Sequence, residues 1–209
     1  MGPLLFTLYT GSLIANVQNK FPEISCHCYA DDTQIYMSFR PDVLAQEQCI
    51  STIQVCVDYI RRWMLENKLM LNDNKTELLL IGTPKQVSKL EFSGVSVGNA
   101  VIKPSASARN LGVHLDKHLN MEDHITNVCK STYYMIYNLR HIRKYLDKDC
   151  MKAVVHACIT SKLDYCNGLL YGVPDSQIGR LQRVQNICAR LIVGGSKFSR
   201  ITPILRDPL

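Results

Sequence analysis

The chain has 209 residues, 46% of them hydrophobic, enough to bury one substantial core or a moderate domain with a smaller appendage. This composition excludes global disorder. The apolar runs, such as residues 78–81, are too short to cross a bilayer, and the first residues lack the pattern of a secretory signal. We therefore expect an intracellular protein, nuclear or cytoplasmic, without membrane contact. The nine cysteines are irregularly spaced, and several lie in apolar helical patterns, which favours reduced buried thiols over disulfides.

Basic charge is concentrated towards the end of the chain. Residues 1–129 hold 11 of the 24 Lys and Arg and 13 of the 18 Asp and Glu, so this part carries −2. Residues 130–209 hold the other 13 basic and 5 acidic residues and carry +8. The asymmetry indicates a segment that binds a phosphate backbone joined to one that holds cations. A solvated helical surface explains the charge alone equally well.

The first part of the chain has a mixed α and β pattern. Residues 3–18 have mostly helical apolar spacing after an opening proline. Residues 24–29 and 33–39 are β-rich runs separated by Asp31-Asp32, which predicts a hairpin with acids at its tip. Residues 42–67 form a long amphipathic helix, with the apolar set Val43, Ile50, Ile53, Val57, Ile60 and Met64.

Shorter β segments follow, and then helices. We expect a strand at 77–81 after the turn cluster 72–74, a hairpin over 95–102 with Gly98-Asn99 as its turn, and β structure at 110–115. Helical spacing then covers 125–142, 151–159 and 178–191. Because this change near residue 120 coincides with the change in charge, we predict two domains, 1–119 and 120–209.

The sharpest local motif is Tyr29-Ala30-Asp31-Asp32 at the tip of the first predicted hairpin. Nucleotide transfer to a primer end uses two divalent cations, and hard cations bind carboxylate oxygens held close together. Two adjacent acids in a strand–turn–strand unit supply such ligands, and a cation offsets their mutual repulsion. The alternative is a solvated turn, since adjacent aspartates are common in hairpins.

The order of further motifs resembles the reverse transcriptases of non-LTR retrotransposons over almost the whole chain. Residues 2–6 with Leu8-Tyr9 look like the end of that family's B motif, and residues 29–32 match its C motif. Residues 60–80 resemble the D motif through Trp63, Asn67, Leu69, Leu71-Asn72 and Lys75-Thr76-Glu77. Residues 109–113, Arg-Asn-Leu-Gly-Val, look like the E motif, the primer grip.

The resemblance implies an α+β fold: a partial polymerase palm, with an antiparallel sheet and packed helices, followed by an all-helical thumb. It implies that Asp31 binds catalytic metal with help from Asp32, with Mg²⁺ as cofactor and Mn²⁺ as a substitute. Lys75 would protonate the leaving group, although a plain surface lysine after a turn fits the same pattern. The primer-grip residues would be Arg109, Leu111 and Gly112, and a strand bulge is the alternative explanation of the glycine.

The implied substrates are an RNA template, a DNA primer and deoxynucleoside triphosphates. The family's first metal-binding aspartate lies in an A motif that precedes the B motif, and this sequence has no counterpart of it. We therefore expect a fragment of a polymerase that is inactive as the isolated chain.

Two other functions stay open. The chain could be a non-catalytic nucleic-acid binder or an unstable remnant without a role. Phosphate contacts by the binder are predicted for five basic residues of the helical part, which are Arg140, Arg143, Lys144, Lys148 and Lys152.

Overall fold

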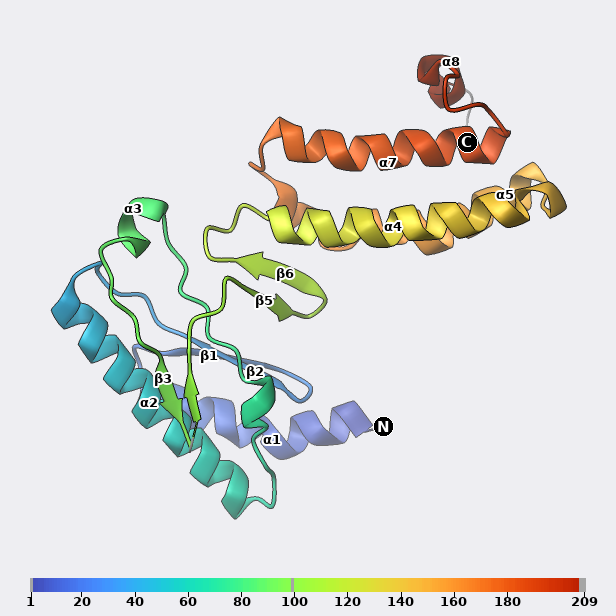
Figure 1. The fold of residues 1–209 in the computed structure, drawn as a ribbon. Helices are drawn as coiled ribbons and strands as arrows, with labels where there is room; N and C mark the ends of the chain where they lie inside the picture. The colour runs from blue at the N-terminus through green and yellow to red at the C-terminus, as the bar shows by residue number, and fades with distance from the viewer. Residues whose placement is uncertain (1, 99, 207–209) are drawn as a thin grey trace. The chain divides into compact units, whose positions relative to one another are not determined.

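A computed structural model describes residues 2–98 and 100–206 of the chain (Figure 1). It divides into two compact units, Met1–Ala106 and Ser107–Leu209. Within the described residues, its strands form three separate two-stranded antiparallel ribbons. The α+β class is therefore confirmed, with small antiparallel ribbons in place of one larger sheet and with the last part of the chain helical after the third ribbon.

Unit 1 contains two long helices and two ribbons. Its elements are α1 (Gly2–Lys20), β1 (Ser25–Tyr29), β2 (Asp32–Tyr36), α2 (Val43–Glu66), η1 (Asp73–Lys75), α3 (Pro84–Val87), β3 (Val95–Val97) and β4 (Ala100–Ile102). Both predicted helices and both predicted hairpins are confirmed. The predicted turn residue Asn99 lies outside the described residues, and its neighbour Gly98 has a φ of +58°.

Helix α2 begins at a capped first turn and packs against the core of unit 1. The Asp42 side chain accepts a hydrogen bond from the Ala45 amide and caps the first turn. Along the helix, the buried side is displaced from the predicted apolar set, because Val43 is 61% exposed while Cys49, Cys56 and Trp63 are buried. Helices α1 and α2 and strand β1 meet in a cluster that comprises Leu13, Val17, Phe21, Ile24, Cys26, Cys56, Ile60, Trp63 and Met64.

The strand predicted at residues 77–81 is wrong. Instead of a strand, this segment has an isolated parallel bridge between Leu78 and Pro104. The Ser105 amide donates a hydrogen bond to the Leu78 carbonyl at 2.8 Å. Proline has no amide hydrogen, so the segment opposite Leu78 cannot continue a regular ladder.

Unit 2 is a helical assembly that begins with a hairpin. Its elements are β5 (Ser107–Asn110), β6 (Val113–Asp116), α4 (Glu122–Ile142), η2 (Arg143–Tyr145), α5 (Lys148–Val155), the π-helical turn η3 (His156–Thr160), α6 (Ser161–Asp164), η4 (Asn167–Leu170), α7 (Asp175–Val193) and α8 (Ile201–Arg206). The three predicted helices are confirmed, and the β structure predicted at 110–115 is the turn and second strand of the β5–β6 ribbon.

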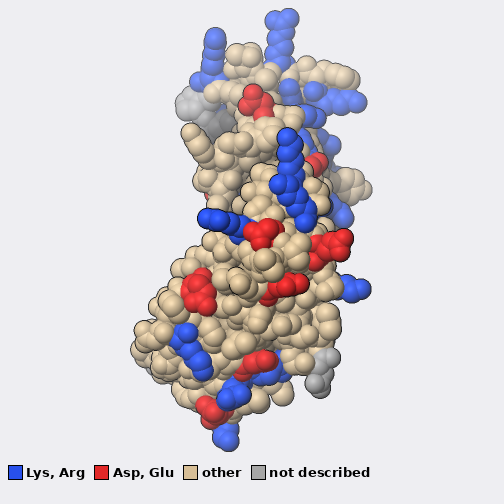
Figure 2. Space-filling model, turned by 90° about the vertical axis from the view of Figure 1, so that its left-hand side faces the viewer, with Lys and Arg blue, Asp and Glu red and all other residues tan. Residues whose placement is uncertain are grey.

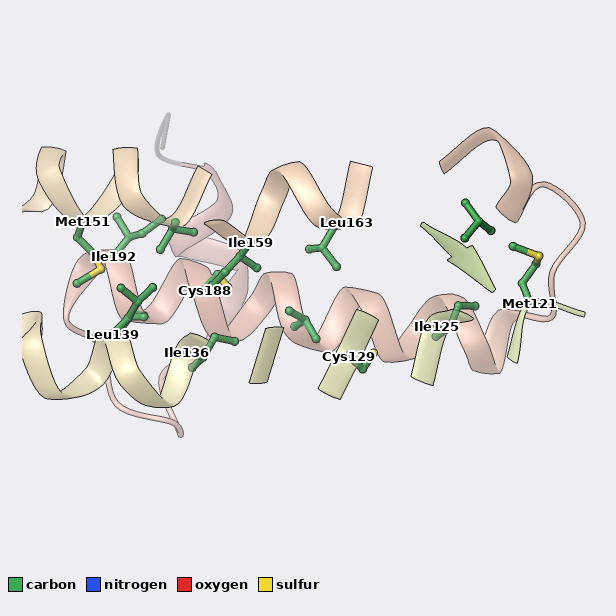
Figure 3. Close-up of a cluster of buried hydrophobic side chains, with 14 residues drawn as sticks. Met121, Ile125, Cys129, Ile136, Leu139, Met151, Ile159, Leu163, Cys188 and Ile192 are labelled. Atoms are coloured by element: carbon green, nitrogen blue, oxygen red, sulfur yellow. The ribbon is translucent and has the colours of Figure 1, made fainter. Parts of the chain in front are cut away.

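The core of unit 2 lies between α4, α7 and the segment from α5 to α6. Figure 3 shows Ile125, Cys129, Ile136 and Leu139 of α4 pointing towards the side chains of the facing helices. Because β6 packs on α4, the ribbon belongs to the helical unit, and the units divide before Ser107. The domain boundary placed at 119/120 stays a prediction.

The described helices include none that is long and apolar enough to span a membrane. All nine cysteines are free. Burial raises the pKa of the Cys56 and Cys188 thiols to about 11, so both are protonated at neutral pH. Five of the cysteines are buried, as their apolar surroundings predicted, whereas Cys150 and Cys166 are exposed.

Candidate active site and nucleic-acid interface

The Tyr-Ala-Asp-Asp motif forms the tip of the β1–β2 ribbon. Tyr29 pairs with Asp32, which leaves Ala30-Asp31 as a two-residue turn, and Ala30 adopts a φ of +51°. The base of the ribbon is fixed in the core of unit 1, because the Cys26 side chain is buried there. Both aspartates are exposed. The fold thus holds two adjacent carboxylates in solvent at the end of an anchored hairpin.

This carboxylate pair is an incomplete metal site. In residues 2–98 and 100–206, no group of three or more His, Cys, Asp and Glu side chains could hold a metal ion. Asp31 and Asp32 supply carboxylate oxygens, the ligands that hard divalent cations prefer. A two-metal centre requires more protein ligands than these two residues provide. The described residues therefore fit one side of such a centre and do not form the whole of it.

The segment that resembles the D motif is held to the end of α2. Asn67 donates through its side-chain amide to the Trp63 carbonyl at 2.8 Å, and the Tyr9 hydroxyl donates to the Asn67 carbonyl at 2.6 Å. Trp63 is a buried core residue. The motif's asparagine and tryptophan therefore terminate and anchor the helix.

Lys75 ends the short helix η1, and its side chain is exposed. The loop before it is fixed by an ion pair between Arg61 of α2 and Asp73. A side chain on Gly98 would collide with the Arg61 guanidinium, since an added Cβ would lie 2.6 Å from Nη2. Arg61 therefore orders the loop that presents Lys75. Arg61 was not among the predicted site residues, because no local pattern pairs it with Asp73, twelve residues further along the chain.

The predicted primer-grip residues lie on the β5–β6 ribbon of unit 2. Leu111 and Gly112 form its two-residue turn, with φ values of +45° and +84°, so the glycine meets a backbone requirement and no bulge is involved. Tyr165 donates from its hydroxyl to the Leu111 carbonyl at 2.6 Å. Arg109 is an exposed residue of β5. The turn is thus fixed to the helical part of the same unit.

The five basic residues predicted to bind phosphate differ in their surroundings. Arg140, Lys144 and Lys148 are exposed, and Lys152 is half-buried. Arg143 donates from its guanidinium to the carbonyls of Leu191, Ile192 and Leu146 at 2.9, 3.0 and 2.8 Å. It therefore satisfies the carboxyl end of α7 as well as carrying charge.

A basic cavity of about 490 Å³ opens beside this arginine in unit 2. It is lined by Arg140, Arg143, Ile187, Arg190, Leu191, Gly194, Gly195 and Lys197. Figure 2 shows Lys and Arg side chains over the helical unit. Arg190 and Lys197 were not among the predicted residues, although they lie on either side of the Gly194-Gly195 pair that follows α7.

One histidine of unit 2 is buried close to a second histidine. His124 of α4 accepts a hydrogen bond at Nδ1 from the His114 amide, at 3.5 Å. Burial lowers the pKa of His124 below its ordinary value, and the neighbouring His114 lowers it further. The neutral imidazole is therefore part of the folded state of this unit.

Comparison with known proteins gives the family. The model of the reverse transcriptase (RNA-dependent DNA polymerase) family matches residues 1–115. The chain is 26% identical over 212 residues to a protein of Drosophila melanogaster described as a probable RNA-directed DNA polymerase from transposon X-element. That match covers 99% of this chain and 22% of the Drosophila protein. No solved structure gives a significant match.

The matched segment contains the carboxylate hairpin, the D-motif loop and the β5–β6 turn. Proteins of this family generally use divalent metal ions, which agrees with exposed carboxylates at the hairpin tip. Since the family match covers more than half of the 209 residues, the expectation from the ordered motifs is confirmed, and the chain belongs to the reverse transcriptase family, of the non-LTR retrotransposon type.

Proposed function

We propose that this chain is part of an RNA-directed DNA polymerase that extends a DNA primer on an RNA template, using deoxynucleoside triphosphates. The observation that carries the proposal is the placement of Asp31 and Asp32 at the tip of a core-anchored hairpin inside the family-matched segment. The chain spans 22% of the Drosophila relative, and in this proposal the polymerase activity is that of a longer protein.

In this proposal Asp31 and Asp32 bind a divalent cation, Mg²⁺ with Mn²⁺ as substitute. Asp31, in the turn at the tip, would be the principal ligand, and Asp32, the first residue of β2, would assist. Two exposed carboxylates hold a cation weakly, because water competes for both partners. We expect the isolated chain to bind the cation without polymerising nucleotides, since the described residues supply no third ligand beside the pair.

The other motif residues receive positioning or proton-transfer roles. Lys75 is an exposed ammonium on a fixed loop and would donate a proton to the pyrophosphate leaving group. Leu111 and Gly112 form a tight turn whose backbone can approach a primer strand closely, and Arg109 adds a cation on the preceding strand. The basic residues around the cavity of unit 2 would contact phosphates of the primer–template duplex.

A chimeric enzyme tests the polymerase proposal. Residues 1–115 of this chain would replace the aligned segment of the Drosophila relative, and primer extension on an RNA template would be measured with Mg²⁺ and Mn²⁺. We expect extension that Asp31→Asn abolishes, whereas the matched control Asp58→Asn, an exposed aspartate on α2, leaves it unchanged. Extension that survives Asp31→Asn would contradict the assignment.

A non-catalytic nucleic-acid binder is the second candidate, favoured by the basic cavity of unit 2. Both candidates predict salt-dependent binding of a primer–template duplex, with affinity falling steeply between about 50 and 200 mM salt. They differ in cation binding. A chain that binds duplex but shows no Asp31-dependent binding of Mn²⁺ would favour the second candidate over the polymerase.

A further inference from the structure

One face of α4, continued into η2, carries aromatic and cationic side chains. Apart from the adjacent pair Tyr133 and Tyr134, they are spaced three or four residues apart, which brings them to the same side of a helix. We call this face the tyrosine stripe, and it consists of Lys130, Tyr133, Tyr134, Tyr137 and His141 of α4 and Lys144 of η2.

The stripe is exposed along its length. Tyr134 is 68% and Tyr137 60% exposed, while Ile125, Cys129 and Ile136 on the opposite side of the helix are buried in the core of unit 2. The helix thus has one apolar face that is covered and one aromatic face that is not. Soluble proteins rarely leave several large aromatic rings together in water without an interaction that uses them.

The stripe carries only positive charge. Between His124 and Leu146 the chain has no Asp or Glu. Cation and ring lie together, since Lys144 Nζ is 4.8 Å from the centroid of the adjacent Tyr145 ring, and the Tyr137 and His141 rings meet edge to face at 4.7 Å. The charge complementarity therefore favours an anionic partner that also presents flat apolar surfaces.

Unpaired nucleic acid has both properties. Its phosphates bind Lys and Arg, and its bases stack on aromatic side chains with little dependence on sequence. Ring positions three and four residues apart rise about 4.5–6 Å along a helix. Nucleotides in a duplex strand are spaced about 3.4 Å apart, and their bases are already stacked on each other. The spacing of the stripe thus suits an extended single strand better than a duplex.

We propose that the tyrosine stripe of α4 binds a single-stranded segment of RNA or DNA by stacking its bases on Tyr134 and Tyr137, with Lys130 and Lys144 contacting phosphates. The proposal rests on the proposed nucleic-acid function and extends it to an unpaired strand. The basic cavity lined by Arg190 and Lys197 then serves phosphates of the duplex, so the two surfaces bind different forms of the substrate.

Fluorescence anisotropy of the 209-residue chain with two probes tests this. One probe is a labelled, unstructured oligonucleotide of about 12 nucleotides, near the site sizes of single-strand binders, and the other is a blunt duplex. The variants are the doubles Tyr134→Ala/Tyr137→Ala and Tyr134→Phe/Tyr137→Phe. The control is Tyr171→Ala, which removes a ring that is 97% exposed and lies outside the stripe.

We expect the alanine double variant to weaken single-strand binding about tenfold or more, because loss of a stacked ring has effects of this size. The phenylalanine double variant keeps the rings and should bind as the wild type does, as should the Tyr171 control. Duplex binding should stay unchanged in all three. Circular dichroism should show the same helix content and melting temperature throughout, since the replaced side chains are exposed.

Unchanged single-strand affinity in the alanine double variant would overturn the proposal, and so would an equal loss with Tyr171→Ala. If the alanine double variant instead abolished self-association in sedimentation analysis and left the oligonucleotide affinity intact, the stripe would be a protein interface and the proposal would be wrong. If the proposed nucleic-acid function itself is wrong, the wild-type chain will not bind the duplex, or will bind it with an affinity that does not depend on salt. This result differs from a loss of single-strand binding in the alanine double variant.

Discussion

Replacing Arg143 separates a structural role from nucleic-acid binding. The guanidinium makes three hydrogen bonds to backbone carbonyls, two of them at the carboxyl end of α7. Arg140 lines the same cavity, is exposed, and makes no hydrogen bond of this kind within the described residues. We expect Arg143→Ala to destabilise unit 2, whereas Arg140→Ala lowers nucleic-acid affinity and leaves stability unchanged.

The size of the effect follows from the contacts. Each hydrogen bond contributes about 0.5–1.5 kcal/mol net, and a cation at a helix carboxyl end adds about 0.3–1 kcal/mol. Because the side chain is half-buried, water can replace part of this set. We therefore expect a loss of about 2 kcal/mol in the free energy of unfolding. For a domain of this size, such a loss corresponds to a melting temperature lower by about 10 °C.

Thermal unfolding of the full chain, followed by circular dichroism at 222 nm, measures the effect. Arg143→Lys provides a further control, because it keeps the charge but cannot reach three carbonyls with one planar group. It should recover less than half of the lost stability. Equal melting temperatures for Arg143→Ala and Arg140→Ala would refute the structural role of Arg143.

Three further predictions concern unit 2. The lowered pKa of His124 means that the folded state binds fewer protons than the unfolded state, so stability should be full above the ordinary value of 6.5 and fall as the pH drops through it. His124→Gln should flatten this dependence in denaturation curves between pH 5 and 8, and an unchanged slope would contradict the assignment. Cys166 is exposed and should react rapidly with a thiol reagent at about pH 8. Cys188, whose pKa burial raises to about 11, should react only on unfolding, and equal native rates would be inconsistent with its burial. Tyr165→Phe removes the hydrogen bond to the Leu111 carbonyl and should cost about 1 kcal/mol in denaturant titrations, whereas no loss would show that this bond does not hold the turn.

Elements with a local signal in the sequence, such as a turn or an apolar period, were predicted from that signal. The two-residue turn at Ala30-Asp31 follows from β-rich runs on either side, and the long helix α2 follows from its apolar period. Its buried side was displaced from the predicted one, because Val43 is exposed while Cys49, Cys56 and Trp63 are buried. Gln46 takes a buried position that periodicity assigns to an apolar residue. The Gln46 side chain donates there to the Glu91 carbonyl at 2.6 Å, a tertiary contact that no local pattern encodes.

Features that depend on distant partners could not be predicted. The segment at 77–81 has β-forming composition, but a strand needs a neighbour with free amides, and Leu78 faces Pro104. The basic cavity joins the end of α4 to the residues after α7, which lie about fifty positions apart in sequence, as the Arg143–Leu191 bond shows. The order of the motifs along the sequence identified the motif residues. The contacts that hold these residues in place, such as the Arg61–Asp73 ion pair, could be recognised only in the folded structure.

The position at which a divalent cation binds to the chain tests the metal assignment most directly. Titration of the ¹⁵N-labelled protein with substoichiometric Mn²⁺, followed by paramagnetic broadening of amide signals, locates the ion without requiring activity. The account predicts that broadening centres on the hairpin tip at residues 29–33, and that Asp31→Asn abolishes it while Asp58→Asn does not. Broadening centred elsewhere, or unchanged in Asp31→Asn, would contradict the assignment of this hairpin as the metal-binding part of the polymerase.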